Sequence, residues 1–373
     1  MRVLIVGAGI GGLAAARALL ADGHEVTVLE SAPELRAAGG AITLWGGGPT
    51  VLADLGVDLD GVGQRLTAIE ARTAAGHVVS EVSTDELGAL VIPRGSLVVR
   101  LARGLPDGTI RFGSRFGRFK DDGSEVRVWT QDGAVHTGDL LIGADGVRSR
   151  VRAALWGDNE PPCTGVASYQ GLIPAPVDLG TRGIMMVGRA GDVGLSPAGD
   201  GLAQWLIDLP WPPPKPHGKP LEMLRRRYGD WASPVPELLD ALSGVALKAW
   251  PHHRLKIRRS WGKGRCTLLG DAAHGMPPIL ALGANQVLED VWVLSRSLTA
   301  AAPETALRTY ERDRRRRAAR ASLFATQAVA FTGPRTLFQS ERSMRMAPAS
   351  SRLSTRAVTA LHRSVSNRLQ VQG

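Results

Sequence analysis

The order of apolar and polar positions at the start of the chain predicts a strand, a helix and a second strand. Residues 3–6 form a short apolar run rich in β-branched side chains, which is typical of a buried strand. Residues 11–22 carry alanine and leucine at helical spacing, and residues 26–29 form a second apolar run that ends at Glu30. Such a unit within about thirty residues favours an α/β fold of the Rossmann type.

Further along the chain, the spacing of apolar positions predicts antiparallel sheets and a helical end. Residues 65–92 alternate as strands do, and a helix is expected after Arg94. Residues 109–142 contain short apolar runs separated by turn residues, which is typical of a meander. Residues 165–250 predict a second antiparallel sheet, and helices dominate from residue 285 onward. The pattern therefore indicates an α/β chain with an inserted β-sheet and C-terminal helices.

Three segments fit these periods less well. The glycine-rich stretch Gly39–Gly48 is too irregular for either a helix or a strand. The arginine cluster Arg312–Arg320 lies in a helical pattern, and we interpret it as a solvated helix face. Residues 331–373 contain arginine and serine with few large apolar side chains, so we expect either a helix packed on the preceding part of the chain or a tail.

Composition narrows the class of protein. Hydrophobic residues make up 44% of the 373 residues, which is enough for a large core. The chain has no run of about 18 apolar residues, so no transmembrane helix is expected. The two cysteines, Cys163 and Cys266, are too few for a disulfide framework, and a reducing, cytoplasmic location is therefore expected.

The charged residues and the histidines indicate neither a nucleic-acid partner nor a metal ion. The net charge of +10 is compatible with nucleic acid, but the arginine cluster has no interleaved aromatic residues, so we expect no nucleic-acid partner. The adjacent His252 and His253 come without any C-x-x-C motif. We therefore expect surface or loop histidines at these two positions and no metal site.

The first chemical motif is Gly7-Ala8-Gly9-Ile10-Gly11-Gly12, which joins the first strand to the first helix. In a G-x-G-x-x-G loop the first glycine permits a tight turn, the second lets the backbone approach a pyrophosphate, and the third lets helix and strand pack closely. Glu30 ends the second strand, where a carboxylate accepts hydrogen bonds from ribose hydroxyls. The predicted dinucleotide-binding residues are Gly7, Gly9, Ile10, Gly11, Gly12 and Glu30.

Two later motifs accompany the glycine loop. The second is Asp139-Leu140-Leu141-Ile142-Gly143-Ala144-Asp145-Gly146-Val147-Arg148-Ser149. The third is Leu268-Leu269-Gly270-Asp271-Ala272-Ala273-His274, and it continues to Gly283-Ala284-Asn285. In this order the three motifs resemble the single-component class A flavin monooxygenases of the para-hydroxybenzoate hydroxylase fold, in the aromatic-ring hydroxylase branch. The resemblance extends to about residue 325.

The resemblance implies a Rossmann-type FAD-binding domain with an inserted antiparallel β-sheet domain for the substrate and C-terminal helices. Residues 1–68, 94–164 and 251–330 would form the FAD-binding domain, and residues 69–93 and 165–250 the substrate domain. It also implies FAD as the cofactor, NADPH or NADH as the reductant, and O₂ with a small aromatic or polyketide-like molecule as substrates. We expect a monomer or homodimer with no membrane attachment.

The resemblance assigns cofactor roles to individual residues. Arg36, Gly40 and Ala41 lie in the loop expected to pass the ribose and the flavin ring, and Arg94 is expected to contact FAD. Asp145 belongs to a stretch associated with both FAD and the pyridine nucleotide. A helix that starts near Gly283 would aim its N–H groups at the flavin. The remaining expected FAD residues are Gly270, Asp271, Pro278, Gly283, Ala284 and Asn285.

The chain departs from the usual family pattern at three positions. In the turn that the family usually writes as P-x-x-G-Q-G-x-N, Ala281 replaces a glycine and Leu282 replaces the glutamine. An alanine at positive φ would be strained, and Leu282 would make the flavin site more apolar. Gln170 stands where an arginine often lies between an aromatic residue and glycine. These changes keep open a flavin reaction that inserts no oxygen, such as a dehydrogenation, rearrangement or cyclisation.

The substrate contacts are predicted only in part. We expect the substrate between the FAD-binding domain and the 165–250 sheet, with Gln170, Met185 and Trp205 as candidates for its wall. Core packing is the alternative for each of the three. No catalytic base is predicted. A non-catalytic nucleic-acid-binding protein is the other alternative, and the intact cofactor motifs argue against it.

Overall fold

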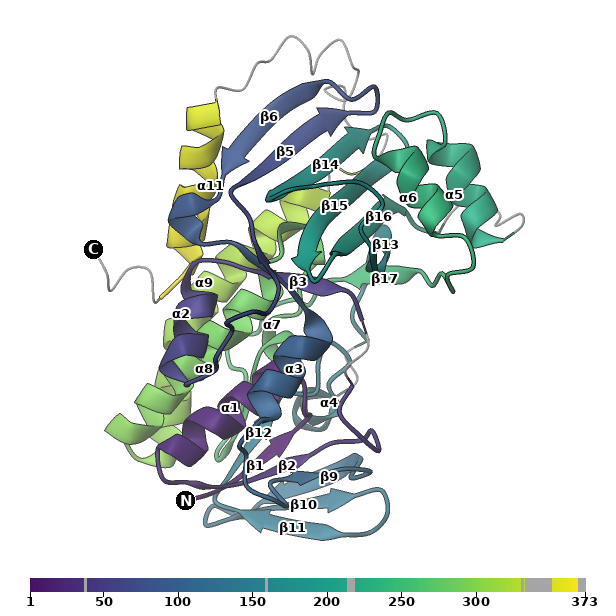
Figure 1. Ribbon diagram of the computed structural model, residues 1–373. Helices are drawn as coiled ribbons and strands as arrows, with labels where there is room; N and C mark the ends of the chain where they lie inside the picture. Colours follow the sequence, from purple (N-terminus) through teal and green to yellow (C-terminus); the bar gives the residue numbers. More distant parts are fainter. Residues whose placement is uncertain (37–38, 158–159, 213–218, 330–331, 333–350, 368–373) are drawn as a thin grey trace.

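A parallel sheet of five strands forms the centre of one half of the molecule (Figure 1). The computed structural model describes residues 1–36, 39–157, 160–212, 219–329, 332 and 351–367. In sheet order, the parallel strands are β18 (Cys266–Leu268), β12 (Leu140–Gly143), β1 (Arg2–Val6), β2 (Glu25–Leu29) and β8 (Ile110–Arg111). The predicted Rossmann-type α/β arrangement is confirmed.

Helices from distant parts of the sequence pack around this sheet. The first helix, α1, runs through small buried side chains that allow close approach. It packs against α3 and α8, and α8 packs against α2 and α9. Their bounds are α1 (Ile10–Ala21), α2 (Gly47–Asp54), α3 (Arg94–Ala102), α4 (Arg150–Trp156), α7 (Asp271–His274), α8 (Gly283–Ala300) and α9 (Pro303–Val329), with short 3₁₀ turns at η1 (Asp85–Leu87) and η2 (Pro278–Leu280).

The predicted meander forms a separate small sheet at the lower edge of Figure 1. Its strands are β9 (Phe116–Asp121), β10 (Val126–Thr130) and β11 (Val135–Gly138), and each pairs antiparallel with its neighbour in sequence. The predicted turn at Asp132-Gly133 is present, with Gly133 at φ 90°. The first and last runs of the predicted meander, β8 and β12, instead join the parallel sheet.

A second large sheet has seven strands and lies in the upper half of Figure 1. Its neighbouring strands pair antiparallel except for β14 and β5, which pair parallel. In sheet order the strands are β17 (Trp250–His253), β13 (Cys163–Pro174), β16 (Leu202–Pro210), β15 (Gly191–Gly199), β14 (Arg182–Gly188), β5 (Ala68–Thr73) and β6 (Val78–Ser83). The helices α5 (Pro220–Tyr228) and α6 (Val235–Ala241) cover its outer face.

The two faces of this sheet carry different side chains because a strand alternates with period two. Tyr169, Trp205 and Ile207 belong to the apolar core beneath α5 and α6. Gln204 and Asp208 on β16 therefore point the other way, toward the parallel-sheet half of the molecule. We name this second side the inner face.

Two predicted boundaries differ from the observed strand pairing. The stretch Gly39–Gly48 contains a strand, β3 (Ala41–Leu44), and the first turn of α2. Neither element was predicted, because the many glycines of this stretch leave no regular spacing of apolar residues. The strand β7 (Leu90–Pro93) pairs with β3 and with β4 (Gln64–Arg65), so it does not extend the large sheet as predicted. This three-stranded sheet joins the two halves.

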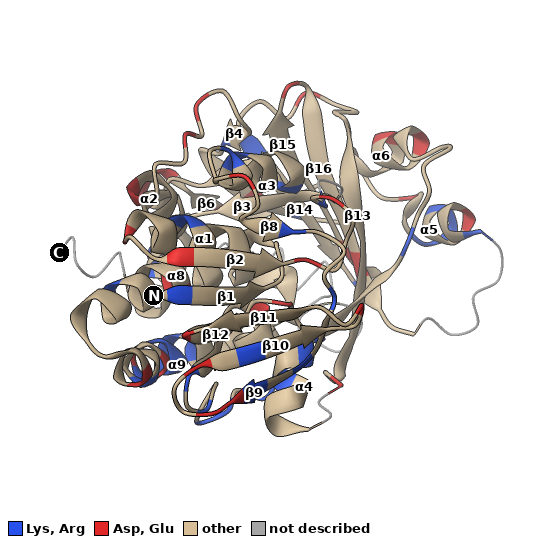
Figure 2. Cartoon of the chain, turned by 90° about the horizontal axis from the view of Figure 1, so that it is seen from below, with Lys and Arg blue, Asp and Glu red and all other residues tan. Residues whose placement is uncertain are grey.

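The arginine cluster on α9 is not a solvated face throughout. Figure 2 shows Lys and Arg positions gathered along α9, and Arg312 is exposed. Arg314, however, is fully buried: its Nε donates to Asp290 Oδ1 at 2.7 Å, and its Nη2 donates to Gln286 Oε1 at 2.7 Å. The prediction of a solvated face is therefore wrong for Arg314, which links α9 to α8.

The C-terminal region contains one described helix, α11 (Ser351–Val365), which packs beside β6 and α9. Ser354 and Thr355 accept hydrogen bonds from Ser80 and from the Ser83 backbone. The ring of His362 lies 4.2 Å from that of Trp45, and burial lowers the pKa of His362 to about 4. The other residues of the predicted 331–373 region, apart from 332, 366 and 367, lie outside the described residues.

Candidate active site

At three of the four glycines in the loop after β1, a side chain would clash with the protein. Gly7 has φ +103°, and a Cβ on Gly12 would lie 1.8 Å from the Gly7 carbonyl oxygen. A Cβ on Gly11 would lie 2.4 Å from Val287 on α8. Gly9 differs, because a Cβ at this position would meet nothing within 4 Å and its backbone borders open space. These contacts match the expected roles of turn, helix packing and close ligand approach.

A cavity of about 420 Å³ opens beside this loop, between the ends of β1 and β2. Glu30 faces it, and its carboxylate accepts hydrogen bonds from the backbone N–H groups of Ala8 at 2.8 Å and Ala32 at 2.7 Å. Arg36 and Arg94 also line it. We call this space the loop cavity.

A second cavity, of about 430 Å³, adjoins the first. The two share lining residues at Gly9, Arg94, Ala144 and Gly146, so they form one continuous cleft. The second cavity reaches from the glycine loop to the inner face of the large sheet, and we call it the central cavity. Its lining includes eleven of the predicted cofactor residues: Gly9, Ile10, Gly11, Gly40, Ala41, Arg94, Gly270, Asp271, Pro278, Gly283 and Ala284.

Two opposite charges face the central cavity near its junction with the loop cavity. The carboxylate of Asp271 opens to the cavity, and enclosure by protein raises its pKa. Burial and the nearby Arg36 lower the pKa of Arg94, whose Nη1 donates to the Arg36 carbonyl oxygen at 3.2 Å. A helix N-terminus lies close by, since Gly283 and Ala284 begin α8. The end of α8 therefore presents a positive dipole to whatever fills the cavity.

Asp145 lies in the loop cavity but its carboxylate holds the protein itself. It accepts hydrogen bonds from the Ser149 hydroxyl and from the backbone N–H groups of Arg150, at 2.7 Å, and Val151. Asp145 thus satisfies the N-terminus of α4. Burial raises the pKa of this carboxyl group.

The turn before α8 shows how the two sequence departures are accommodated. Ala281 has φ 49° and ψ 33°, which is the left-handed region. Asn285 supports the turn: its Nδ2 donates to the Ala281 carbonyl at 2.9 Å, and its Oδ1 accepts from the Trp45 N–H at 3.0 Å. Leu282 is 1% exposed and packs with Met276 and the C-terminal helices. Leu282 is absent from the described lining of the central cavity, although its neighbour Met276 is part of it, so the effect of Leu282 on the flavin site stays a prediction.

The three predicted substrate residues fall in three different places. Gln170 on β13 lines the central cavity. Met185 pairs with Gly194, which pairs with Leu206, so it lies on the inner face two strands beyond Leu206. Trp205 is 2% exposed and lies on the outer face, in the core under α5 and α6. Trp205 is thus a packing residue, which was the alternative left open for it.

Sequence reasoning missed a polar cluster on the inner face. Ser168 and Asp208 line the central cavity, and the Ser168 hydroxyl donates to Asp208 Oδ1. The same hydroxyl lies 2.6 Å from Nε2 of His252 on β17, which is 3% exposed. The expectation of a surface or loop residue is therefore wrong for His252. The period-two pattern of β13 and β16 contains the signal, since Ser168 and Gln170 on β13, and Gln204 and Asp208 on β16, share one face of otherwise largely apolar strands.

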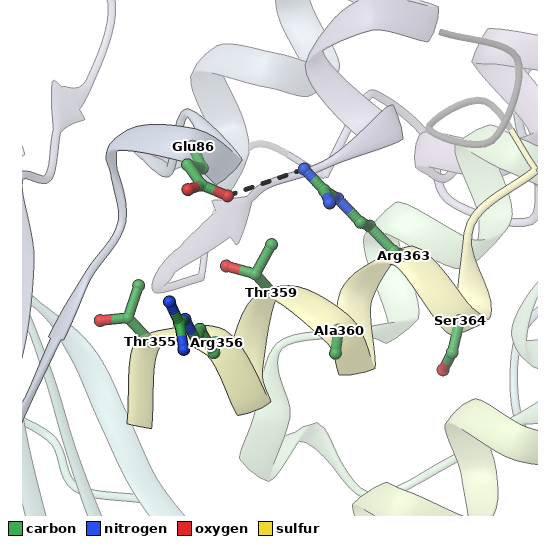
Figure 3. Close-up of a pocket in the computed structure, with 7 residues that line it drawn as sticks. All are labelled: Glu86, Thr355, Arg356, Thr359, Ala360, Arg363 and Ser364. Carbon is green, nitrogen blue, oxygen red and sulfur yellow. Dashed lines mark ion pairs between the residues drawn. The ribbon is translucent and has the colours of Figure 1, made fainter. Parts of the chain in front are cut away.

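Other hollows lack this combination of features. One, of about 540 Å³, lies along α11, where Arg363 pairs with Glu86 at 3.7 Å (Figure 3). Another, of about 690 Å³, is lined by Trp156 and by basic residues that precede β18. Within the described ranges, no group of three His, Cys, Asp or Glu side chains could hold a metal ion. None of the described helices has the length and apolarity of a membrane span.

The continuous cleft, the glycine loop and the end of α8 fit a dinucleotide that runs from Glu30 to the inner face. Residues 1–325 match the sequence family described as the FAD binding domain. The chain belongs to this FAD-binding family. The predicted resemblance to class A flavoprotein monooxygenases is confirmed, and the protein is an FAD-dependent oxidoreductase of that class.

Individual relatives cover most of the chain. The chain is 35% identical over 327 residues to 3-amino-4-hydroxybenzoate 2-monooxygenase of Streptomyces cremeus, covering 83% of this chain and 82% of that protein. It is 32% identical over 312 residues to aurachin C monooxygenase/isomerase of Stigmatella aurantiaca, covering 80% and 81%. The crystal structure of Klebsiella pneumoniae HpxO complexed with FAD and uric acid superposes with a TM-score of 0.89 at 27% identity, covering 98% of this chain and 96% of that one.

Proposed function

We propose that this enzyme uses NADPH or NADH to insert one oxygen atom of O₂ into a small aromatic substrate bound in the central cavity. The observation that carries the proposal is the continuity of this cavity, which joins the glycine loop at Gly9 to Gln170 on the inner face. A cofactor laid along the cleft would meet a substrate held by the sheet. Ring substrates of similar relatives, a benzoate and uric acid, support the aromatic class.

The chain's own residues would hold FAD mainly through backbone groups. Gly9 and Gly11 would admit the pyrophosphate to the start of α1, and Glu30 would accept the ribose hydroxyls. Asp271 and the N-terminus of α8 would lie beside the flavin, where the helix dipole favours negative charge. Bound FAD supplies the redox chemistry that activates O₂. Arg36, Gly40, Ala41, Arg94, Asp145, Gly270, Pro278, Gly283, Ala284 and Asn285 complete the proposed FAD-binding set.

The inner face would orient the substrate and exclude water. Leu206 and Met276 give the cavity apolar walls, and Gln170 and Asp208 give it polar contacts. Such a wall favours a flat ring held at its edge by hydrogen bonds. We include Gln170 and Met185 in the proposed substrate side, with Met185 at its outer end.

A second candidate reaction remains within the same fold. The left-handed Ala281 sits in the turn before α8, where the family usually has glycine. The name of one relative, aurachin C monooxygenase/isomerase, includes isomerase activity, which supports keeping rearrangement as a candidate reaction. The alternative is therefore an oxidation, rearrangement or cyclisation that leaves no O₂-derived oxygen in the product.

Isotope labelling tests the proposal against this alternative. The FAD-loaded enzyme would be given NADPH, ¹⁸O₂ and a panel of phenols and hydroxypyridines, with products analysed by mass spectrometry. We expect one labelled oxygen per product molecule. Substrate turnover without label would favour the alternative reaction, and NADPH consumption that no panel member stimulates would contradict an aromatic substrate.

We also propose a cellular location and an oligomeric state for the protein. Cys163 and Cys266 are free thiols, which supports a reducing, cytoplasmic location where NADPH is available. We propose a monomer or homodimer, to be measured by light scattering.

A further inference from the structure

The charges in the central cavity are distributed unevenly. Arg94 is the cation among its described lining residues, and it lies where the central and loop cavities meet. At the other end, β13 and β16 present Ser168, Gln170, Gln204, Leu206 and Asp208 to the cavity. Within the described lining, therefore, the sheet end holds a carboxylate and no basic side chain.

Asp208 is held firmly at this end. It is 5% exposed, and its Oδ1 accepts the hydroxyl of Ser168 on the neighbouring strand β13. The Ser168 hydroxyl also contacts His252 Nε2, so three strands, β16, β13 and β17, fix its position. In Figure 1 these strands lie side by side, with α5 and α6 on the outer side. Within the described part of the chain, Oδ2 of Asp208 accepts no hydrogen bond and is available to a ligand.

Gln170 is uncharged, so it does not offset the negative charge of Asp208 at the sheet end of the cavity. It projects from β13 into the cavity two residues from Ser168, on the same face. This is the position at which the resembling family often has an arginine. A glutamine gives and accepts hydrogen bonds but cannot neutralise a carboxylate. A ligand carboxylate at the sheet end would therefore meet Asp208 with no counter-charge in the described lining.

We propose that this site selects an aromatic substrate without a carboxylate, and that Asp208 Oδ2 accepts the proton of a ring O–H or N–H group on that substrate. This inference rests on the proposed function and specifies its substrate class. The preference would set this chain apart from relatives named for a benzoate or a nicotinate.

The proton step is balanced within the site. The substrate O–H or N–H bond breaks, its electron pair stays on the substrate atom, and a new O–H bond forms on Asp208 Oδ2. The electron-rich ring is then the better partner for an electrophilic oxygen. When the oxygenated ring regains its aromaticity, its oxygenated carbon loses a proton to solvent, and Asp208 returns its own proton to the ring oxygen or nitrogen from which it came. Besides His252, a titratable group that faces Asp208 is Asp192, its partner on β15, whose pKa burial raises to about 7. Burial raises the pKa of Asp208 itself to about 6, which suits a group that both takes and returns a proton near neutral pH.

Matched pairs of ring compounds test the charge preference. In each pair, the two compounds differ only by a carboxylate: 2-aminophenol with 3-amino-4-hydroxybenzoate, and 2-hydroxypyridine with 6-hydroxynicotinate. Binding would be measured from flavin difference spectra of the FAD-loaded enzyme, and turnover from stimulated NADPH oxidation. We expect the neutral member to bind about 100-fold more tightly, since juxtaposed like charges cost several kcal/mol.

Three variants assign the preference to residues. Gln170→Arg is expected to raise the affinity for the carboxylated members at least about tenfold, because it adds a counter-charge. Asp208→Asn is expected to narrow the preference and to remove the fall in kcat/KM below about pH 6 that protonation of Asp208 causes. Asp200→Asn, at an exposed turn with φ 53° that asparagine tolerates, is the control and should change neither.

The outcomes separate this inference from the function on which it rests. Carboxylated members that bind as tightly as the neutral ones, or an Asp208→Asn enzyme that keeps the wild-type pH profile and turnover, would overturn the inference and leave the monooxygenase function standing. If no member of either pair perturbs the flavin of an enzyme that NADPH reduces, both the small aromatic substrate class and the inference are contradicted.

Discussion

The glycine loop after β1 and the inner face of the large sheet border the same cavity but recognise ligands by different means. The loop offers backbone groups and excludes side chains, as the 1.8 Å approach of a Gly12 Cβ to Gly7 shows. The inner face offers side chains on a regular backbone, where Gln170 and Asp208 line the cavity. Substitution in the loop should therefore affect folding and cofactor binding, whereas substitution on the sheet should alter selectivity.

The largest expected effect separates two glycines of the loop. Gly12→Ala forces a Cβ against the Gly7 carbonyl, and we expect a loss of at least about 3 kcal/mol in unfolding free energy together with loss of bound FAD. Gly9→Ala is the matched control, because its Cβ would meet no protein atom within 4 Å. It should fold normally and bind FAD more weakly. Thermal unfolding and FAD stoichiometry measure both, and equal stability of the two variants would contradict the comparison.

A second comparison concerns the arginines of α9. Arg314→Met removes the guanidinium from the buried Asp290, which keeps only His274 and the Gly270 N–H as partners, and we expect a loss of about 3–5 kcal/mol in the free energy of unfolding. Arg312→Met, at an arginine whose side chain is 71% exposed, should change it by less than about 0.5 kcal/mol. Urea titrations monitored by circular dichroism would test this. If the two variants lost similar amounts of unfolding free energy, the buried contacts of Arg314 would contribute little to stability.

Buried carboxyl groups on the inner face should also make the free energy of unfolding depend on pH, whereas the glycine loop, Gly7 to Gly12, contains no titratable side chain. Burial raises the pKa of Asp192, opposite Asp208 on β15, to about 7. The folded state therefore binds this proton more tightly than the unfolded state, and stability falls as pH rises from about 4 to 7. Asp192→Asn should remove this fall, so its stability relative to wild type should rise by a few kcal/mol over that range.

A surface control completes the pH experiment. Asp240→Asn changes a carboxylate on α6 whose side chain is 78% exposed, and it should follow the wild-type curve. His252 acts in the opposite sense, because burial lowers its pKa to about 4 and stability falls as pH drops from about 6.5 to 4. The difference between Asp192→Asn and wild type isolates the carboxylate. A difference that stays constant with pH would count against this account.

The smallest expected effect concerns the turn before α8. Ala281→Gly should stabilise the protein by about 0.5–1 kcal/mol, because glycine adopts the left-handed region without the Cβ penalty. Ala319→Gly, on the exposed face of α9, should instead destabilise it by about 1 kcal/mol. Chemical denaturation at constant FAD saturation measures both. A destabilising Ala281→Gly would show that the turn is not strained.

The cofactor side was readable from the sequence for a physical reason. Glycine positions report backbone geometry directly, so the motif pattern alone was enough to assign the loop from Gly7 to Gly12 and the strand-turn at Gly270. The inner face could not be read in this way. Whether Trp205 or Gln204 points to the cavity depends on strand phase, and phase is set by pairing with β13 and β15. The burial of His252 was not predictable locally, because it depends on β17 pairing with β13, which brings His252 against Ser168.

The measurement that tests the central claim most directly is an anaerobic absorbance titration of the purified protein. FAD would be added first, then NADPH or NADH, with and without 2-aminophenol. One FAD cofactor running through both cavities predicts a bound flavin spectrum that the reductant bleaches and the ring compound perturbs. Protein that binds no FAD, or bound flavin that neither reductant bleaches with or without the ring compound, would contradict the account.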